Sequence, residues 1–125
     1  MHQQIRTVPA KSPADLQAFL TVLAKAGLSI KSAGGSNLGS GGEFAFGLED
    51  EEYDRAMDVL RKASYKPRLV DVDYRAIPDE PGELLRFVTE VAEQNLQAGR
   101  VILDIAIGVP DADRNIQVQV YSESP

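Results

Sequence analysis

Cysteine and tryptophan are absent from this sequence, and His2 is its only histidine. Without cysteine, the chain can form no disulfide bond, no thiolate nucleophile and no cysteine-ligated metal site. One histidine beside the N-terminus supplies neither a histidine-containing catalytic triad nor a histidine-rich metal site. The acidic stretches DEPGE and DADRN lack the spacing of an EF-hand calcium loop. We therefore expect no bound metal and no cofactor.

Positive charge and long apolar runs are also scarce. The chain has 13 lysine and arginine residues against 19 acidic ones, which argues against nucleic-acid binding because such surfaces need clustered basic residues. No apolar run approaches the ~18 residues of a membrane span. The N-terminal MHQQIRTV also lacks the apolar segment of a signal peptide. These absences predict a cytoplasmic protein that binds neither nucleic acid nor a membrane.

What the sequence does contain is 43% hydrophobic residues, enough for a core, arranged in alternating strand and helix patterns. Pro13 suits the first position of a helix that should end at Gly27, and a second helix should begin at Asp50. Glycines punctuate a flexible loop over residues 34–42. Strands are expected at residues 5–8, 28–33, 43–48, 68–77, 101–108 and 116–121.

A third helix repeats the pattern of the first. Asp79 or Glu80 is expected to cap it, Pro81 to take its first position, and Asn95 to end it, because asparagine tolerates a left-handed backbone. Residues 12–30 aligned with residues 80–98 share six identities and the same sequence of loop, cap and exit. The element order is β α β β α β followed by α β β. This order predicts an internal repeat of the ferredoxin-like arrangement.

Two strands carry charged residues whose faces can be predicted. In VILDIAIG, alternation should place Val101, Leu103, Ile105 and Ile107 on one face and Asp104 on the other. In the strand at residues 68–77, three charged residues share a face, and pairing with charges on a neighbouring strand explains them without a catalytic role. These three are Asp71, Asp73 and Arg75.

The repeated stretch resembles the ACT domain family. The second copy reads PDEPGELLRFVTEVAEQNLQA and the first PAKSPADLQAFLTVLAKAGLSI, close to the family pattern of PDxPGxLxxF and a helix ending in LAxAGINI. The resemblance covers nearly the whole chain, whose arrangement resembles that of small stand-alone tandem ACT proteins. Departures are Ala14 at the family's glycine position in the first copy and the absence of the family's exit asparagine from both copies.

The resemblance implies a non-catalytic regulatory module that binds a small effector, most often an amino acid, where two ACT units meet. The implied ligand positions are the loop before each helix and the residues after it. In the second copy they are Asp79, Glu80, Pro81, Gly82, Glu83, Leu84, Asn95, Leu96 and Gln97. In the first copy they are Lys11, Ser12, Pro13, Ala14, Asp15, Leu16, Leu28 and Ser29.

Elementary chemistry is compatible with such a site. A helix N-terminus presents free N–H groups that can hold a carboxylate, and Gly82 would let a ligand approach the backbone closely. The side-chain amide of Gln97 could accept a hydrogen bond from an ammonium group. An amino acid offers both groups.

The resemblance also implies an α+β fold of two ferredoxin-like βαββαβ units, at residues 1–69 and 70–125. Each unit would be an antiparallel sheet with helices on one face. The second unit would stop after its third strand, which leaves a sheet edge for a partner chain and predicts a homodimer. With no output domain in the sequence, we expect a separate partner enzyme or regulator.

Two other function classes remain open from the sequence. One is a ligand-free module that assembles with itself or an enzyme through sheet edges, with both loops packed shut. The other is a small ferredoxin-like enzyme, for which Asp71, Asp73, Arg75 and Asp104 are the candidate polar cluster. No nucleophile and base accompany that cluster.

Overall fold

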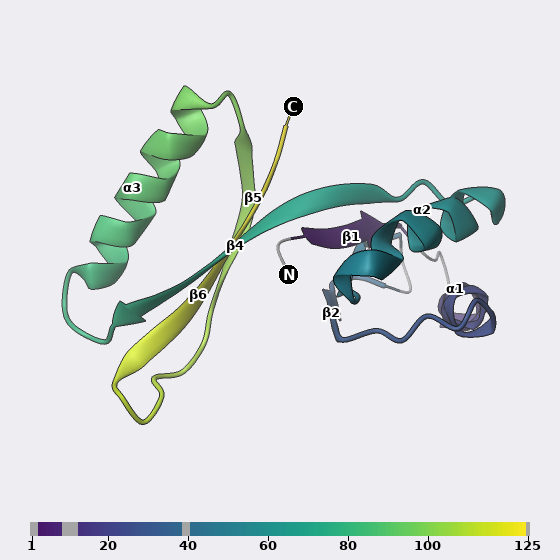
Figure 1. Cartoon of the computed structure of the whole chain (residues 1–125), viewed down its shortest axis with the longest axis horizontal. Helices are drawn as coiled ribbons and strands as arrows, with labels where there is room; N and C mark the ends of the chain where they lie inside the picture. Colours follow the sequence, from purple (N-terminus) through teal and green to yellow (C-terminus); the bar gives the residue numbers. More distant parts are fainter. Residues whose placement is uncertain (1–2, 9–12, 39–40, 125) are drawn as a thin grey trace. The chain divides into compact units, whose positions relative to one another are not determined.

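The computed structural model describes residues 3–8, 13–38 and 41–124, which form two compact units that divide between Val70 and Asp71 (Figure 1). Three α-helices and six strands make an α+β fold among these residues. In chain order the elements are β1 (Gln3–Thr7), α1 (Pro13–Lys25), β2 (Ser32–Gly35), β3 (Phe44–Gly47), the 3-10 turn η1 (Asp50–Glu52), α2 (Tyr53–Lys62), β4 (Arg68–Pro78), α3 (Glu83–Gln97), β5 (Val101–Ile107) and β6 (Asn115–Glu123).

The first unit has the expected βαββαβ order. Its strands lie in the order β2-β3-β1-β4, with Ile5 of β1 opposite Phe46 of β3 and Ala33 of β2 on the other side of Phe46. Strands β1 and β2 are both antiparallel to β3, so they run parallel to each other with β3 between them. Helix α1 connects them, which is the split βαβ arrangement.

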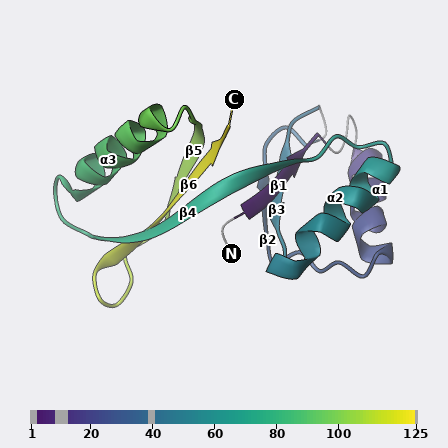
Figure 2. The ribbon, with the colours of Figure 1, turned by 45° about the horizontal axis from the view of Figure 1, so that its top comes forward.

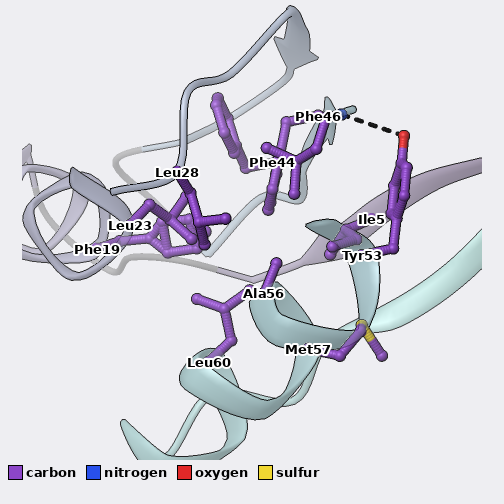
Figure 3. Close-up of a cluster of buried hydrophobic side chains, with 11 residues drawn as sticks. Ile5, Phe19, Leu23, Leu28, Phe44, Phe46, Tyr53, Ala56, Met57 and Leu60 are labelled. Atoms are coloured by element: carbon purple, nitrogen blue, oxygen red, sulfur yellow. Dashed lines mark hydrogen bonds between the residues drawn. The ribbon is translucent and has the colours of Figure 1, made fainter. Parts of the chain in front are cut away.

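A compact aromatic cluster forms the core of the first unit (Figure 3). Phe19 of α1 is fully buried, and its ring stands edge-on to those of Phe44 and Phe46, with centroids 5.7 Å and 6.0 Å away. Aliphatic residues and Tyr53 of α2 close the cluster. Both helices therefore cover the face of the sheet that carries Ile5 and Phe46.

The second unit repeats the first four elements. Its strands lie in the order β4-β6-β5, and β6 is antiparallel to both neighbours, so β4 and β5 are parallel and α3 connects them (Figure 2). Phe87 and Val91 of α3 pack on Val118 and Val120 of β6. Phe19 and Phe87 thus occupy the same place in the two copies, as their alignment predicts.

Two strand predictions are wrong in detail. Strand β2 begins at Ser32, because Leu28 turns into the core and is 6% exposed, and the strand includes Gly34 and Gly35 from the expected loop. In β5 a register shift between Ile102 and Asp104 breaks the alternation. As a result Ile102 joins Ile105 against the core.

The charged face of β4 lies beside α3. Arg75 forms an ion pair with Glu90 of α3 at 3.3 Å and lies 3.9 Å from Asp73. Asp71 pairs with Arg100, which follows α3. The charged residues of this face are matched mainly by partners on and after the helix, rather than by the cross-strand pairs predicted from the sequence.

Candidate functional site

The loop between β4 and α3 turns through Gly82, whose φ of 86° lies in the left-handed region. The amide of Asp79 donates to the carbonyl of Arg114 at 2.9 Å, and the amide of Glu83 to that of Glu80 at 3.2 Å. Helix α3 begins at Glu83 with Gly82 as its N-cap. The predicted cap at Asp79 or Glu80 and the predicted helical position of Pro81 are therefore wrong, because the left-handed glycine delays the helix.

A hollow of about 430 Å³ lies where β4 ends. The hairpin beside it is shaped by the Asp111 carboxylate, which accepts from the amides of Asp113 and Asn115 at 2.9 Å and 3.0 Å. Three acidic residues and one arginine line this hollow, so its charge favours a cation such as an ammonium group. Its lining residues are Pro78, Asp79, Glu80, Asp113, Arg114 and Asn115.

Of the predicted loop residues, only Asp79 and Glu80 line this hollow. Pro81 and Gly82 are exposed in the turn, and Leu84 is 36% exposed. Glu83 is held by Arg86, with 3.6 Å between its carboxylate and the guanidinium. The sequence pattern predicted the loop that supplies Asp79 and Glu80, but it did not point to the hairpin residues of the hollow, which are distant along the chain.

The first copy has a hollow of about 280 Å³ at the corresponding strand end. Arg68 and Glu43 make two side-chain contacts across it, one of 3.2 Å, and Arg6 lies 4.0 Å from the same carboxylate. With Lys66 exposed beside them, positive charge exceeds negative charge here. The lining residues include Thr7, Glu43, Ser64, Tyr65, Lys66 and Arg68.

Thr7 gives this hollow a second unusual feature. Its hydroxyl is buried without a hydrogen-bond partner in the part of the chain that the structure describes, and the residue is 2% exposed. A buried hydroxyl that makes no hydrogen bond costs free energy, so its retention is a candidate signal of function. No sequence motif singled out Thr7, and only its position at the end of β1 could have done so.

The predicted first-copy residues do not line this hollow where they are described. Lys11 and Ser12 lie outside the described residues. Pro13 begins α1, as predicted, and Ala14 and Asp15 are exposed on its first turn with Leu16 half-buried. The hollow is instead lined by Glu43 just before β3, by residues 64–66 before β4, and by Arg68 at the start of β4.

The two hollows occupy equivalent places in the repeat. In the first unit, Thr7 at the end of β1 pairs with Phe44 at the start of β3. In the second, Pro78 at the end of β4 pairs with Asn115 at the start of β6. Each hollow therefore lies at the end of the strand that precedes the first helix of its copy, although the two differ in charge.

The residues predicted to follow the first helix of each copy take different positions in the two copies. After α1, Gly27 has a φ of 74° and Leu28 is buried, with exposed Ser29 following it. Asn95, Leu96 and Gln97 do not follow a helix, because α3 continues to Gln97. The predicted exit at Asn95 is wrong, since its side chain donates to the Val91 carbonyl at 2.8 Å within the helix.

Two described side chains, Lys62 and Tyr74, have raised pKa values. A hydrogen bond from Lys62 to Asp58, together with the charge of Asp58, raises the pKa of Lys62 on the surface of α2. Burial raises the pKa of Tyr74 on β4. Neither residue lines the hollows described above.

Within residues 3–8, 13–38 and 41–124, no group of three or more histidine, cysteine, aspartate or glutamate side chains could hold a metal ion. None of the helices there is long and apolar enough to cross a membrane.

Comparison with solved structures shows the fold. Protein BT0572 from Bacteroides thetaiotaomicron matches 98% of this chain and 79% of its own at 18% identity, with a TM-score of 0.63. The regulatory subunit of aspartate kinase from Thermus flavus matches 97% of this chain and 82% of its own at 19% identity, with a TM-score of 0.56. The Thermus thermophilus subunit, in a ligand-free form, gives 18% identity and a TM-score of 0.52 over 95% of this chain and 82% of its own.

These structures are ACT-domain proteins, and this chain has the ACT fold, as its sequence pattern indicates. No protein-family model matches the sequence, and no curated protein matches it.

Proposed function

We propose that this chain is a non-catalytic regulatory module that binds a small amino-acid effector and acts as a homodimer on a separate enzyme or regulator. The observation that carries the proposal is the pair of hollows at equivalent strand ends, each at the end of the strand that precedes the first helix of its copy. Two solved structures with the same fold are regulatory subunits of aspartate kinase, which is consistent with a regulatory role here.

The second hollow supplies groups for the ammonium end of an amino acid, and the start of α3, which follows its Asp79 and Glu80 along the chain, offers amides for the carboxylate. Asp79, Glu80 and Asp113 attract the ammonium group. The Glu83 amide is bonded to the Glu80 carbonyl, but the amides of Leu84 and Leu85 have no carbonyl four residues earlier within the helix, so they can donate to the carboxylate. Gly82 carries no side chain, and no atom lies within 4 Å of the place where a Cβ would stand. A ligand can therefore approach the backbone of this turn.

Binding would act through a population shift. An effector that prefers one arrangement of the two chains stabilises that arrangement by its difference in affinity. A partner protein that contacts this arrangement would then detect the effector without any chemistry in the chain itself.

The experiment is thermal unfolding of the chain with each of the twenty amino acids at millimolar concentration. A ligand at 100 times its dissociation constant stabilises the folded state by about 2.7 kcal/mol, which raises the melting temperature of a small domain by several degrees. A shift confined to one or a few amino acids is expected. Equal melting temperatures with all twenty would contradict the amino-acid assignment.

The ligand-free assembly module remains the second candidate, and exposed apolar residues favour it. Leu85 and Leu96 of α3 are 72% and 81% exposed. Assembly without any effector-induced shift in melting temperature would favour this alternative. The enzyme alternative loses its support, because Asp71, Asp73 and Arg75 are engaged in ion pairs.

A further inference from the structure

Helix α3 carries apolar residues on two sides. Phe87 and Val91 are buried in the core of the second unit, whereas Leu85 and Leu96 project from another side of the helix. Helical geometry places Thr89 and Ala92 between these two leucines, because the successive spacings are four, three and four residues. We call Leu85, Thr89, Ala92 and Leu96 the outer stripe.

The outer stripe lies on the side of α3 that is turned toward β5. Glu90, on the opposite side of the helix, contacts Arg75 of β4 at 3.3 Å. Because β6 separates β4 from β5, the side away from Glu90 faces β5. Ile107 pairs with core-facing Val118 and is 52% exposed. The stripe and this strand thus expose apolar area on one side of the unit, which is a mark of an interaction surface.

We propose that the outer stripe binds the outer stripe of a second copy of this chain, with the two α3 helices antiparallel about a two-fold axis. The axis would pass between Thr89 and Ala92, whose small side chains permit close approach of the helices. Leu85 of one chain then packs against the partner's Leu96, and the reverse contact follows from the symmetry. This single arrangement covers the four leucines of the two outer stripes, Leu85 and Leu96 of each chain.

Charged residues beside the outer stripe support a second copy of this chain as the binding partner. Arg86 and Glu93 lie seven residues apart along one border of the stripe, and both are exposed, with Arg86 also 3.6 Å from Glu83 of its own helix. In an antiparallel pair centred between Thr89 and Ala92, Arg86 of each chain faces the partner's Glu93. Opposite charges bordering an apolar helix seam favour that pairing and its orientation.

This inference rests on the homodimer of the proposed function but not on the effector, so the two are tested separately. Sedimentation equilibrium of the full chain without any amino acid should give twice the chain mass of 13.6 kDa. Leu96→Glu should abolish the dimer while circular dichroism remains that of the wild type, because Leu96 contacts little within its own chain.

A charge exchange gives the sharper test. Arg86→Glu and Glu93→Arg should each raise the dimer dissociation constant at least tenfold, and the double variant should return it to within about threefold of wild type. Asp54→Arg, an equal change of charge on exposed α2, is the matched control and should leave the constant unchanged. A monomeric wild type, a Leu96→Glu variant that still dimerises, or a double variant without recovery would overturn the proposal.

Discussion

Arg75 of β4 lies over the ring of Phe87 on α3, with its guanidinium carbon 4.9 Å from the ring centroid. In the first unit, α1 and α2 both contribute to the core cluster that contains Ile5. In the second unit, the described residues form one helix, α3. Charged residues of β4 lie beside it and form ion pairs with Glu90 of α3 and with Arg100, which follows it. The two copies therefore share one backbone arrangement but differ in the side chains of the strand before the first helix. β1 contributes apolar Ile5 to the core, whereas β4 places charged residues beside α3.

Arg75→Ala should destabilise the chain by about 1 kcal/mol, through loss of the cation–π contact and the partly exposed pair with Glu90. Urea unfolding measures the change in free energy of unfolding. Arg61→Ala, at an exposed position on α2, is the control and should change the free energy by less than about 0.5 kcal/mol. Equal effects of the two substitutions would contradict the assigned contacts.

Tyr53→Phe should destabilise the chain by about 1–3 kcal/mol. The buried hydroxyl accepts from the amide of Leu48 at 3.1 Å, the bond drawn as a dashed line in Figure 3. It also donates to the carbonyl of Gln3 at 2.7 Å, so its removal leaves backbone groups unpaired. Tyr65→Phe removes a hydroxyl from a half-buried tyrosine and serves as the comparison. Thermal unfolding should show the larger drop for Tyr53→Phe.

Thr7→Val should leave stability equal or raise it by up to about 1 kcal/mol, because it replaces an unpaired buried hydroxyl with a methyl group of similar size. Thr7→Ser keeps the hydroxyl and removes the methyl group, so it should lower stability by about 1 kcal/mol. Chemical unfolding of both variants compares them directly. A clear loss of stability in Thr7→Val would mean that the hydroxyl has a partner.

Gly82→Ala should weaken effector binding at least tenfold, because its methyl group occupies the turn that the ligand approaches. Gly99→Ala is matched for backbone strain, since Gly99 also has a positive φ, 67° against 86°, and also has open space at its Cβ position. Each substitution should cost about 1 kcal/mol of stability. Calorimetric titration with the effector found in the thermal panel should show loss of affinity for Gly82→Ala alone.

The order of the elements could be predicted because apolar spacing reports which side of a helix or strand is buried. Phe19 and Phe87, paired by the internal repeat, are both buried at the same place in their units. The ends of α3 could not be predicted as well. Asn95 and Gly99 both tolerate a left-handed backbone, and the structure uses Gly99 because the Asn95 side chain bonds within the helix.

Local sequence signals were enough to predict loops before two helices, because proline, glycine and apolar periodicity act over a few residues. These signals were not enough to find the residues that surround each hollow. Glu43 and Arg68 form an ion pair in the hollow that Thr7 lines, and Asp113 and Asp79 line the other hollow together. Both arrangements arise because strand pairing brings distant segments together. Local spacing therefore decided the elements of this protein, and the pairing of its strands decided which charges gather at its candidate sites.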